Sequence, residues 1–371
     1  MKNFFVPIDG GNTIGASSYF VNVDGNNILL DCGSRTSGVE KYPRFDKLYD
    51  CLNTPKEIDF VIISHAHFDH MGCLPYVSDM VSKSTVFLST KTTKELSRLQ
   101  LLEMNRVLGK NDSEMVRCEK QLKAENAINR IRDIPMMKKQ KFKNAEITLI
   151  PAGHMLGAAM TYIQTKNHNI LYTGDFSFET RSNINSIKLH SLKPDILIMN
   201  ATHGYTCYEY TKDYSDLINE VNTNLEKGKN ILLSSRSIPK LLDLFYLINE
   251  SNINGYVYLS PETEIMADSF ERIGNKVYSS KIQGYRKDRN KPHVLIGSAD
   301  EFLGDYEEIS VDKYSLHASY DELQRMIEIL NPKKVFIVHT QPKDVSFNIV
   351  SDMKKNNMDI VQCFNEELYE F

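Results

Sequence analysis

The sequence lacks the features that would place it among membrane, disulfide-rich or low-complexity proteins. No apolar run approaches the roughly 20 residues that span a bilayer, and no internal repeat or Pro/Gly/Ser-rich linker interrupts the chain. Its six cysteines are scattered without a C-x-x-C pair, which argues against a disulfide framework or a structural zinc ribbon and favours reduced thiols. The first residues turn polar too soon for a signal peptide. We therefore expect a soluble, cytoplasmic protein.

The chain also lacks an excess of either charge sign. It has 44 Lys and Arg residues against 48 Asp and Glu residues, which gives a formal net charge of −4. This balance excludes a uniformly basic coat for nucleic acid but leaves room for a local basic cleft. A chain of 371 residues, of which 41% are hydrophobic, is long enough for one large core or two smaller ones.

The densest group of chemically active side chains is Ser64-His65-Ala66-His67-Phe68-Asp69-His70. It follows the apolar run 60–63, so the sequence places it at the end of a strand. Alternate residues of a strand share one face, so His65 and His67 can point to one side, while Asp69 and His70 lie on the following turn. Imidazole and carboxylate ligands suit zinc, with manganese or iron as alternatives. The pattern predicts a site for two metal ions.

The first half of the chain is mainly of strand type. A hairpin is expected at 19–31, with its turn at Asp24-Gly25-Asn26-Asn27, and further strands at 58–63 and 86–88. Residues 71–82 are expected to be helical. Apolar residues at helical spacing predict two helices between 92 and 139, outside the core or over the mouth of the site. Strands return at 147–150, 161–163, 170–172 and 196–199.

After about residue 204 the pattern alternates between helix and strand. Helices are expected at 216–226, 238–249 and 261–273, with strands at 229–234, 255–259 and 293–297. Such alternation predicts a small α/β insert with a largely parallel sheet. A last strand–helix–strand segment is expected over 308–338, with the helix at 320–330.

Three more strand ends carry residues of metal-ligand type. His154 lies among small residues after the strand at 147–150, Asp175 follows Tyr172-Thr173-Gly174, and His339 ends the apolar strand 335–338. A β-sheet can bring such strand ends to one rim. We therefore expect these residues to join the His65–His70 group in a single site.

These pieces together resemble the metallo-β-lactamase fold superfamily and, within it, the β-CASP nucleases, which include the endonuclease subunit of the pre-mRNA 3′-end cleavage factor and its prokaryotic relatives. The resemblance runs from about residue 9 to residue 340. The matching segments are 30–33, 64–70, 152–159, 172–177, 314–317 and 338–339.

The resemblance implies an αββα sandwich formed by residues 1–203 and 309–371, with a reduced β-CASP-like α/β cap at 204–308. It also implies metal sites and catalytic roles for individual residues. His65, His67 and His154 would hold one zinc ion, Asp69, His70 and His339 the other, with Asp175 bridging the two. Asp31 would orient the metal loop, and His317 would be the general acid. In such proteins a histidine at the position of His339 goes with RNA substrates, which favours RNA over DNA.

The chain departs from this pattern in two ways. Where the family has an acidic residue that hydrogen-bonds the general-acid histidine, this chain has Asn200. A neutral amide favours a protonated His317 less than a carboxylate does, so we expect weaker acid catalysis or a substitute carboxylate. The candidates for that substitute are Asp300, Glu301 and Asp312.

The second departure is the short cap, which offers fewer phosphate contacts and predicts weaker, more salt-sensitive binding. The cap residues that are candidates for backbone contacts are Arg236, Arg286, Lys287, Arg289 and Lys291, although the basic loop could equally be a solvated turn. For Arg35 and Arg181, which follow metal-loop motifs, a substrate contact and a structural salt bridge are both open.

The main functional hypothesis is a two-zinc phosphodiesterase that cuts RNA, without a nucleotide cofactor. One alternative is a metal-dependent hydrolase of another substrate, such as a DNA end, a cyclic nucleotide, a thioester or a lactone. Another is a weakly active scaffold subunit of an RNA-processing complex. The sequence leaves open whether the chain forms a homodimer or binds an RNA-processing partner protein.

Overall fold

The structure is a computed structural model that describes residues 3–36, 38, 40–178, 189, 191–204, 215–235, 238–272, 274–287, 292–297, 304, 306–311, 317–340, 345–355 and 358–371. The chain divides into two compact units. The first unit combines residues Met1–Tyr208 with His317–Phe371, and the second consists of Glu209–Leu316. The second unit is thus an insertion into the first, as the sequence resemblance predicts.

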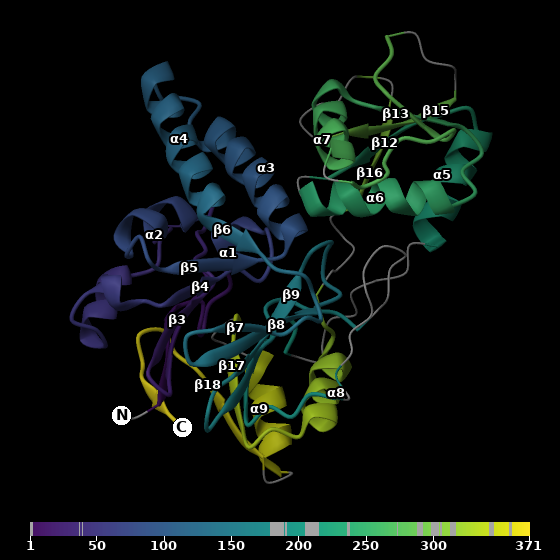
Figure 1. Cartoon of the computed structure of the whole chain (residues 1–371). Helices are drawn as coiled ribbons and strands as arrows, with labels where there is room; N and C mark the ends of the chain where they lie inside the picture. The colour runs from purple at the N-terminus through teal and green to yellow at the C-terminus, as the bar shows by residue number, and fades with distance from the viewer. Residues whose placement is uncertain are drawn as a thin grey trace. The chain divides into compact units, whose positions relative to one another are not determined.

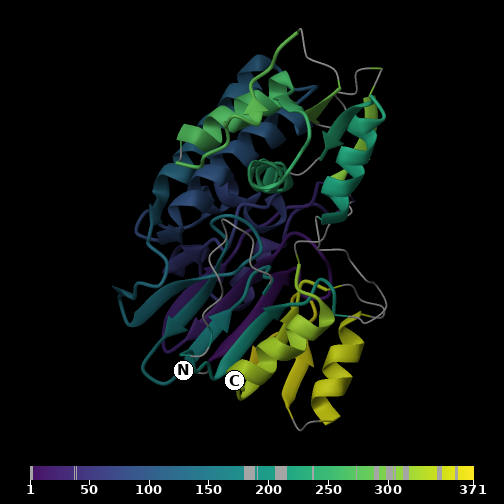
Figure 2. The same cartoon turned by 90° about the vertical axis from the view of Figure 1, so that its right-hand side faces the viewer.

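One sheet of the first unit has the strand order β19-β1-β2-β3-β4-β5-β6. Its strands are β1 (Phe4–Asp9), β2 (Ser18–Val23), β3 (Asn26–Leu30), β4 (Phe60–Ile62), β5 (Val86–Ser89), β6 (Ile131–Asp133) and β19 (Tyr369–Glu370). The β2–β3 hairpin turns at Asp24 and Gly25, which both have positive φ angles, the geometry of a tight two-residue turn. The two ends of the chain lie close together, where β19 pairs with β1 (Figures 1 and 2).

The other sheet has the order β18-β17-β11-β10-β9-β8-β7. Its strands are β7 (Gln140–Phe142), β8 (Ala145–Pro151), β9 (Ala159–Gln164), β10 (Asn169–Tyr172), β11 (Ile196–Asn200), β17 (Lys334–Val338) and β18 (Asp359–Gln362). Since β9 is antiparallel to both β8 and β10, and β10, β11 and β17 are mutually parallel, the last residues of β8, β10, β11 and β17 lie at one edge.

The two sheets pack face to face around a shared core. Alternate residues of both sheets contribute to it, including Phe5, Leu30 and Ile62 from the first sheet and Ile163 and Phe336 from the second. The opposite residues of the first sheet pack against helices α1 (Phe68–Met71), α2 (Leu74–Met80), α3 (Lys91–Leu108) and α4 (Glu114–Arg130). Helix α9 (Val345–Lys355) packs against β18, and helix α8 (Tyr320–Leu330) packs against α9 (Figure 1). This is the expected αββα sandwich.

The second unit contains a five-stranded sheet in the order β14-β13-β15-β12-β16. All of its described pairings are parallel. The strands are β12 (Asn230–Ser234), β13 (Tyr256–Leu259), β14 (Ile282–Gln283), β15 (His293–Gly297) and β16 (Tyr306–Ser310), and the helices are α5 (Ser215–Glu226), α6 (Ile238–Glu250) and α7 (Pro261–Arg272). The expected parallel α/β insert is therefore confirmed.

Some expectations about individual elements were wrong. The helical region expected over 92–139 ends at Arg130, because β6 and β7 follow it, and the strand-rich first 65 residues also contain two short 3₁₀ helices, η1 (Phe45–Asp50) and η2 (Pro55–Glu57). The strand at the start of the expected 308–338 segment is β16, which pairs with β12 in the second unit and not with β17. A membrane-spanning helix was not expected, and no helix of the described residues is long and apolar enough to form one.

Candidate metal centre

The side chains of ligand type follow the ends of four strands. His65, His67, Asp69 and His70 follow β4, His154 follows β8, Asp175 follows β10, and His339 follows β17. Three of these strands end at the same edge of the second sheet, which brings residues far apart in sequence together. The seven side chains form two groups, one of His65, His67, His154 and Asp175 and one of Asp69, His70 and His339.

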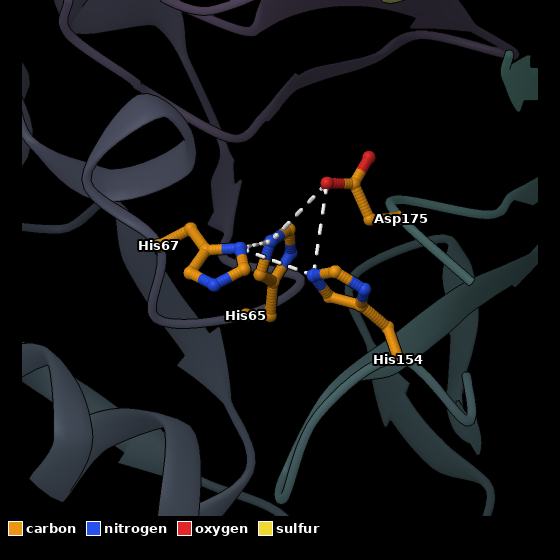
Figure 3. A group of neighbouring side chains, drawn as sticks. All are labelled: His65, His67, His154 and Asp175. Atoms are coloured by element: carbon orange, nitrogen blue, oxygen red, sulfur yellow. Dashed lines mark hydrogen bonds and ion pairs between the residues drawn. The ribbon is translucent and has the colours of Figure 1, made fainter. Parts of the chain in front are cut away.

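The first group converges on a point between its ring nitrogens. His67 Nδ1 lies 3.0 Å from His65 Nε2 and 3.0 Å from His154 Nε2. Asp175 Oδ2 lies 3.7 Å from each of these two Nε2 atoms. The four side chains point toward one another, with His65 and His67 on one segment and His154 and Asp175 on two others (Figure 3). Spacings of this order suit four ligand atoms around one tetrahedral zinc ion with bonds of about 2 Å.

The second group lies beside the first and shares Asp175 with it. Asp69 Oδ2 lies 3.8 Å from both His70 Nε2 and His339 Nε2. Asp175 Oδ2 lies 3.5 Å from His70 Nε2, and Asp175 Oδ1 lies 4.0 Å from His339 Nε2. Asp175 therefore faces both groups, which is the placement of a bridging carboxylate.

Asp31 holds both ends of the segment 64–70 through hydrogen bonds. Its Oδ2 accepts hydrogen bonds from His70 Nδ1 (2.8 Å), Ser64 Oγ (2.7 Å) and Tyr172 OH (2.6 Å), and its Oδ1 accepts one from the Ser64 backbone N–H (2.7 Å). Because a carboxylate can only accept, Nδ1 of His70 carries a proton, and Nε2 is therefore the nitrogen that the neutral ring would offer to a metal ion. Asp31 thus orients His70, a candidate ligand, and this is the role that the resemblance would give it.

Backbone geometry brings these segments close together. Cys32 N–H donates to the carbonyl of His70, and Ser17 N–H donates to the carbonyl of Asp69. A Cβ atom on Gly33 would lie 1.7 Å from the Asp69 carbonyl oxygen, so only glycine fits there. Ser17 Oγ is hydrogen-bonded to His339 Nδ1 (2.8 Å). No local signal in the sequence links Ser17 to a histidine 322 positions away.

The donor set itself fits a metal centre. His70 Nε2 and Asp175 Oδ2 are buried without a hydrogen-bond partner. Burial of an unpaired polar atom costs folding free energy, unless the atom binds a cation. Burial and the neighbouring imidazoles lower the pKa of His65 well below its usual range, so its ring is neutral and able to ligate. Burial alone would raise the pKa of Asp175, but His339, His317 and His70 hold it well below its usual range. A neutral imidazole beside an ionised carboxylate is the ligand chemistry of zinc.

His317 reaches the same centre from the segment before α8. Its Nδ1 lies 3.4 Å from Asp175 Oδ2, and its ring centroid lies 4.8 Å from that of His154. Burial lowers the pKa of His317 to about 4, opposed by Asp175. The chain's own groups thus favour the neutral ring. His203, which the sequence analysis did not single out, lies with its ring centroid 5.5 Å from that of His317.

Asn200, at the end of β11, contacts the shared ligand. Its Nδ2 donates to Asp175 Oδ1 (2.9 Å), while its own backbone N–H donates to Thr173 Oγ1 (3.1 Å). The Asn200 side chain is buried, and its Oδ1 has no hydrogen-bond partner. The described contact of this amide is therefore with the bridging carboxylate, whereas the sequence analysis considered it as a neighbour of His317.

The structure describes only some of the residues that the sequence analysis proposed as substrate contacts or substitute carboxylates. Arg286 and Lys287 are described and exposed in the second unit. Arg35 forms a two-pronged salt bridge with Asp9, with N–O distances of 2.7 and 2.6 Å, so the salt-bridge alternative applies to it. The remaining candidates, together with the proposed substitute carboxylates, lie outside the described residues: Arg181, Arg236, Arg289, Lys291, Asp300, Glu301 and Asp312.

Comparisons with known proteins agree with this geometry. Residues 20–202 match the metallo-beta-lactamase superfamily domain, and residues 307–347 match the Zn-dependent metallo-hydrolase RNA specificity domain. A crystal structure of a protein of unknown function from Enterococcus faecalis V583 aligns over the whole of both chains with a TM-score of 0.68 and 16% identity, which shows a shared fold.

Curated relatives match over part of their length. Integrator complex subunit 11 of Danio rerio is 26% identical over 76% of this chain and 49% of its own length. Endoribonuclease YSH1 of Yarrowia lipolytica is 32% identical over 66% of this chain and 29% of its own length. Cleavage and polyadenylation specificity factor subunit 3-I of Arabidopsis thaliana is 27% identical over 66% of this chain and 35% of its own length. The chain thus spans less than half the length of these relatives. With its αββα fold and its two matched domains, the chain belongs to the metallo-β-lactamase superfamily.

Proposed function

We propose that this protein is a two-zinc hydrolase that cleaves phosphodiester bonds in RNA. The observation that carries the proposal is the placement of Asp175 between two groups of ligand side chains, within 4.0 Å of a nitrogen in each. The RNA specificity domain match, which includes His317 and His339, favours RNA over DNA. One relative's name, Endoribonuclease YSH1, is consistent with this substrate.

Each ion would have its own set of ligands. His65, His67 and His154 would hold one zinc ion, and Asp69, His70 and His339 the other. Asp175 would contact both, since its Oδ2 lies 3.7 Å from His154 Nε2 of the first group and 3.5 Å from His70 Nε2 of the second. Zinc at such a centre supplies a water with a pKa lowered to about 7 and positive charge that neutralises the scissile phosphate.

The chain's own residues would complete the reaction. Cleavage breaks the bond between phosphorus and a ribose oxygen, and that oxygen must leave with a proton. His317 would deliver it, and its position 3.4 Å from Asp175 Oδ2 supports this role. A bound phosphate brings negative charge beside His317, which raises the pKa of its ring and favours the protonated form that acts as acid. Asp31 and Ser17 hold His70 and His339 in orientation throughout.

The second unit would contribute contacts to the RNA backbone. We assign this role to Arg236, Arg286 and Arg289, because arginine side chains bind phosphate oxygens without regard to sequence. With few such contacts, binding should weaken steeply as salt is raised.

The test is metal content by mass spectrometry on the purified protein, combined with cleavage of labelled single-stranded RNA and DNA. We expect close to two zinc ions per chain and cleavage of RNA. His317→Ala should lower the RNA cleavage rate by about 10²–10⁴-fold, the usual contribution of general acid–base catalysis, while zinc content stays the same. His168→Ala is the matched control, because His168 lies in the β9–β10 turn, hydrogen-bonded to Asn3.

Other outcomes would contradict the proposal. Two zinc ions without cleavage of either polymer would favour a small-molecule phosphodiester or a partner-dependent enzyme. Less than one metal ion per chain, not restored by added zinc or manganese, would favour a scaffold subunit.

A further inference from the structure

Glu322, in the first turn of α8, joins two segments of the candidate site with its two carboxylate oxygens. Oε2 accepts hydrogen bonds from the backbone N–H of Ser319 (2.7 Å) and from Ser319 Oγ (3.0 Å). Oε1 accepts hydrogen bonds from the backbone N–H of Phe178 (2.5 Å) and from Ser177 Oγ (3.3 Å). One side chain thus contacts both the segment after His317 and the segment after Asp175.

Helix capping accounts for only one of these oxygens. Ser319 and Glu322 form a capping box, in which the Ser319 side chain accepts from the Glu322 backbone N–H and Glu322 Oε2 accepts from the Ser319 backbone N–H. Such a box stabilises the start of a helix and needs no other partner. The bonds of Oε1 to Ser177 and Phe178 are additional, and they connect α8 to a loop more than 140 positions earlier.

The loop that Oε1 holds is itself part of the metal centre. Ser177 is two residues after Asp175 and is buried. Its backbone N–H donates to the carbonyl of Ala152 (3.0 Å), two residues before His154. Glu322 is therefore connected through Ser177 to the segments that carry Asp175 and His154. Its other partner, Ser319, is two residues after His317.

We propose that Glu322 is a positioning residue that holds His317 against Asp175, at the distance required for proton delivery to the leaving oxygen. This inference rests on the proposed phosphodiesterase function. α8 buries Leu323, Met326, Ile327 and Leu330, so the helix stays in place without Glu322. What the carboxylate adds is the link between the start of the helix and the Asp175 loop. Small displacements of a catalytic group are enough to reduce rates strongly.

A dependence on the leaving group separates this role from a general loss of stability. A ribose oxygen is a poor leaving group and needs a proton, whereas p-nitrophenolate leaves without one. Glu322→Ala should therefore lower kcat for RNA by about tenfold or more. It should change kcat for a nucleoside p-nitrophenyl phosphodiester by less than about threefold, because that reaction uses the same metal centre but no general acid.

Asp321→Ala is the matched control. Asp321 lies in the same first turn of α8, so its removal takes away the same negative charge from the helix N-terminus, and its side chain is exposed. We expect this variant to retain both activities. In a His317→Ala background, Glu322→Ala should cause no further loss on RNA, because the group it positions is absent. Circular dichroism and thermal unfolding establish that both variants are folded.

A second readout does not depend on cleavage. In the zinc-loaded protein with ¹⁵N-labelled histidine, the ring signals of His317, assigned by their loss in His317→Ala, should shift or broaden in Glu322→Ala and stay unchanged in Asp321→Ala. If the wild type cleaves neither substrate but these signals move as expected, the proposed function is wrong and the positioning role stands. If the wild type cleaves both substrates and Glu322→Ala keeps its RNA rate, the positioning role is wrong. If the His317 signals are unchanged in Glu322→Ala, the positioning role is wrong, whether or not the wild type cleaves RNA.

Discussion

Two buried residues of the candidate metal centre adopt strained backbone conformations. Asp31 and His339 adopt positive φ angles of 60° and 53°, a conformation that costs residues other than glycine about 1–2 kcal/mol. Each is fixed by a backbone hydrogen bond, Asp31 N–H to the Ile62 carbonyl (2.9 Å) and His339 N–H to the Gly10 carbonyl (2.6 Å). The surrounding strands thus hold these two residues in conformations they would otherwise avoid, which is expected where side chains must be aimed at one point.

Asn200→Asp tests how a carboxylate in place of the amide beside Asp175 changes stability. In Asn200→Asp, the hydrogen bond to Asp175 Oδ1 is replaced by a second buried carboxylate at about the same distance. Burial and the like charge of Asp175 raise the folded-state pKa of the introduced carboxyl group above its value of about 3.9 in the unfolded chain. Between these two pKa values the folded state binds more protons than the unfolded state, so stability falls as pH rises.

We therefore expect metal-free Asn200→Asp to lose up to about 1.4 kcal/mol of unfolding free energy, relative to the wild type, for each pH unit in this window. Urea unfolding in the presence of chelator at pH 5 and pH 8 measures the difference. Asn200→Ala is the control, because it removes the amide without adding a titrating group and its deficit should be the same at both pH values. A deficit of Asn200→Asp that does not grow with pH would contradict the prediction.

At the scale of elements, the sequence predicts the strands that carry the candidate ligands better than it predicts edge strands and long-range hydrogen bonds. The ligands follow apolar runs such as 60–63 and 335–338, so a strand ending in a His or Asp is visible from local pattern alone. β7 escapes notice because it is an edge strand of three residues, only partly buried, and edge strands carry polar residues that blur the alternation. The bond from Ser17 to His339 escapes because it depends on which strands become neighbours, and β1, β2 and β17 are distant in sequence.

The loop at residues 10–17 is held by a partly buried ion pair. Arg35 donates to Asp9 through both terminal nitrogens, and also to Thr13 Oγ1 (2.8 Å) and the Gly15 carbonyl (3.1 Å). The hydrogen bonds from Arg35 to Asp9 raise the pKa of the guanidinium. Since this loop ends at Ser17, the partner of His339, the salt bridge positions the site and leaves few donors of Arg35 for a substrate.

Arg35→Lys should consequently act on stability and not on RNA binding. A lysine cannot reproduce the two-pronged contact, and we expect a loss of about 1–3 kcal/mol in the free energy of unfolding, measured with urea. The dependence of RNA affinity on salt should be unchanged. Arg286→Ala should do the reverse, reducing the slope of log K against log salt by about 1 if Arg286 binds one phosphate, with stability unaffected.

Arg44→Lys is the control for the chemical change, because the Arg44–Asp46 pair is exposed on the same unit and its loss should leave stability unaltered. A reduced salt slope in Arg35→Lys with normal stability would show instead that Arg35 contacts the substrate.

At the scale of the whole molecule, the seven candidate metal ligands belong to one of the two compact units. The seven side chains lie within Met1–Tyr208 and His317–Phe371, and none of them lies in Glu209–Leu316. The second unit has its own apolar core, with Leu232, Tyr258 and Leu295 buried together from neighbouring parallel strands. Metal binding should therefore be linked to the folding free energy of the first unit alone, although the second unit is inserted into its chain.

Removing the metal tests this linkage. Zinc at about 1,000 times its dissociation constant stabilises the state that binds it by about 4 kcal/mol. A strong chelator should accordingly speed hydrogen exchange in β4, β8 and β17, which precede the ligands, and leave β12, β13 and β15 as protected as before. Asp69→Ala should mimic the chelator, and chelation should then have a smaller effect. Equal loss of protection in both units would mean that they unfold as one, because the free energy of metal binding would then reach strands that carry no ligand.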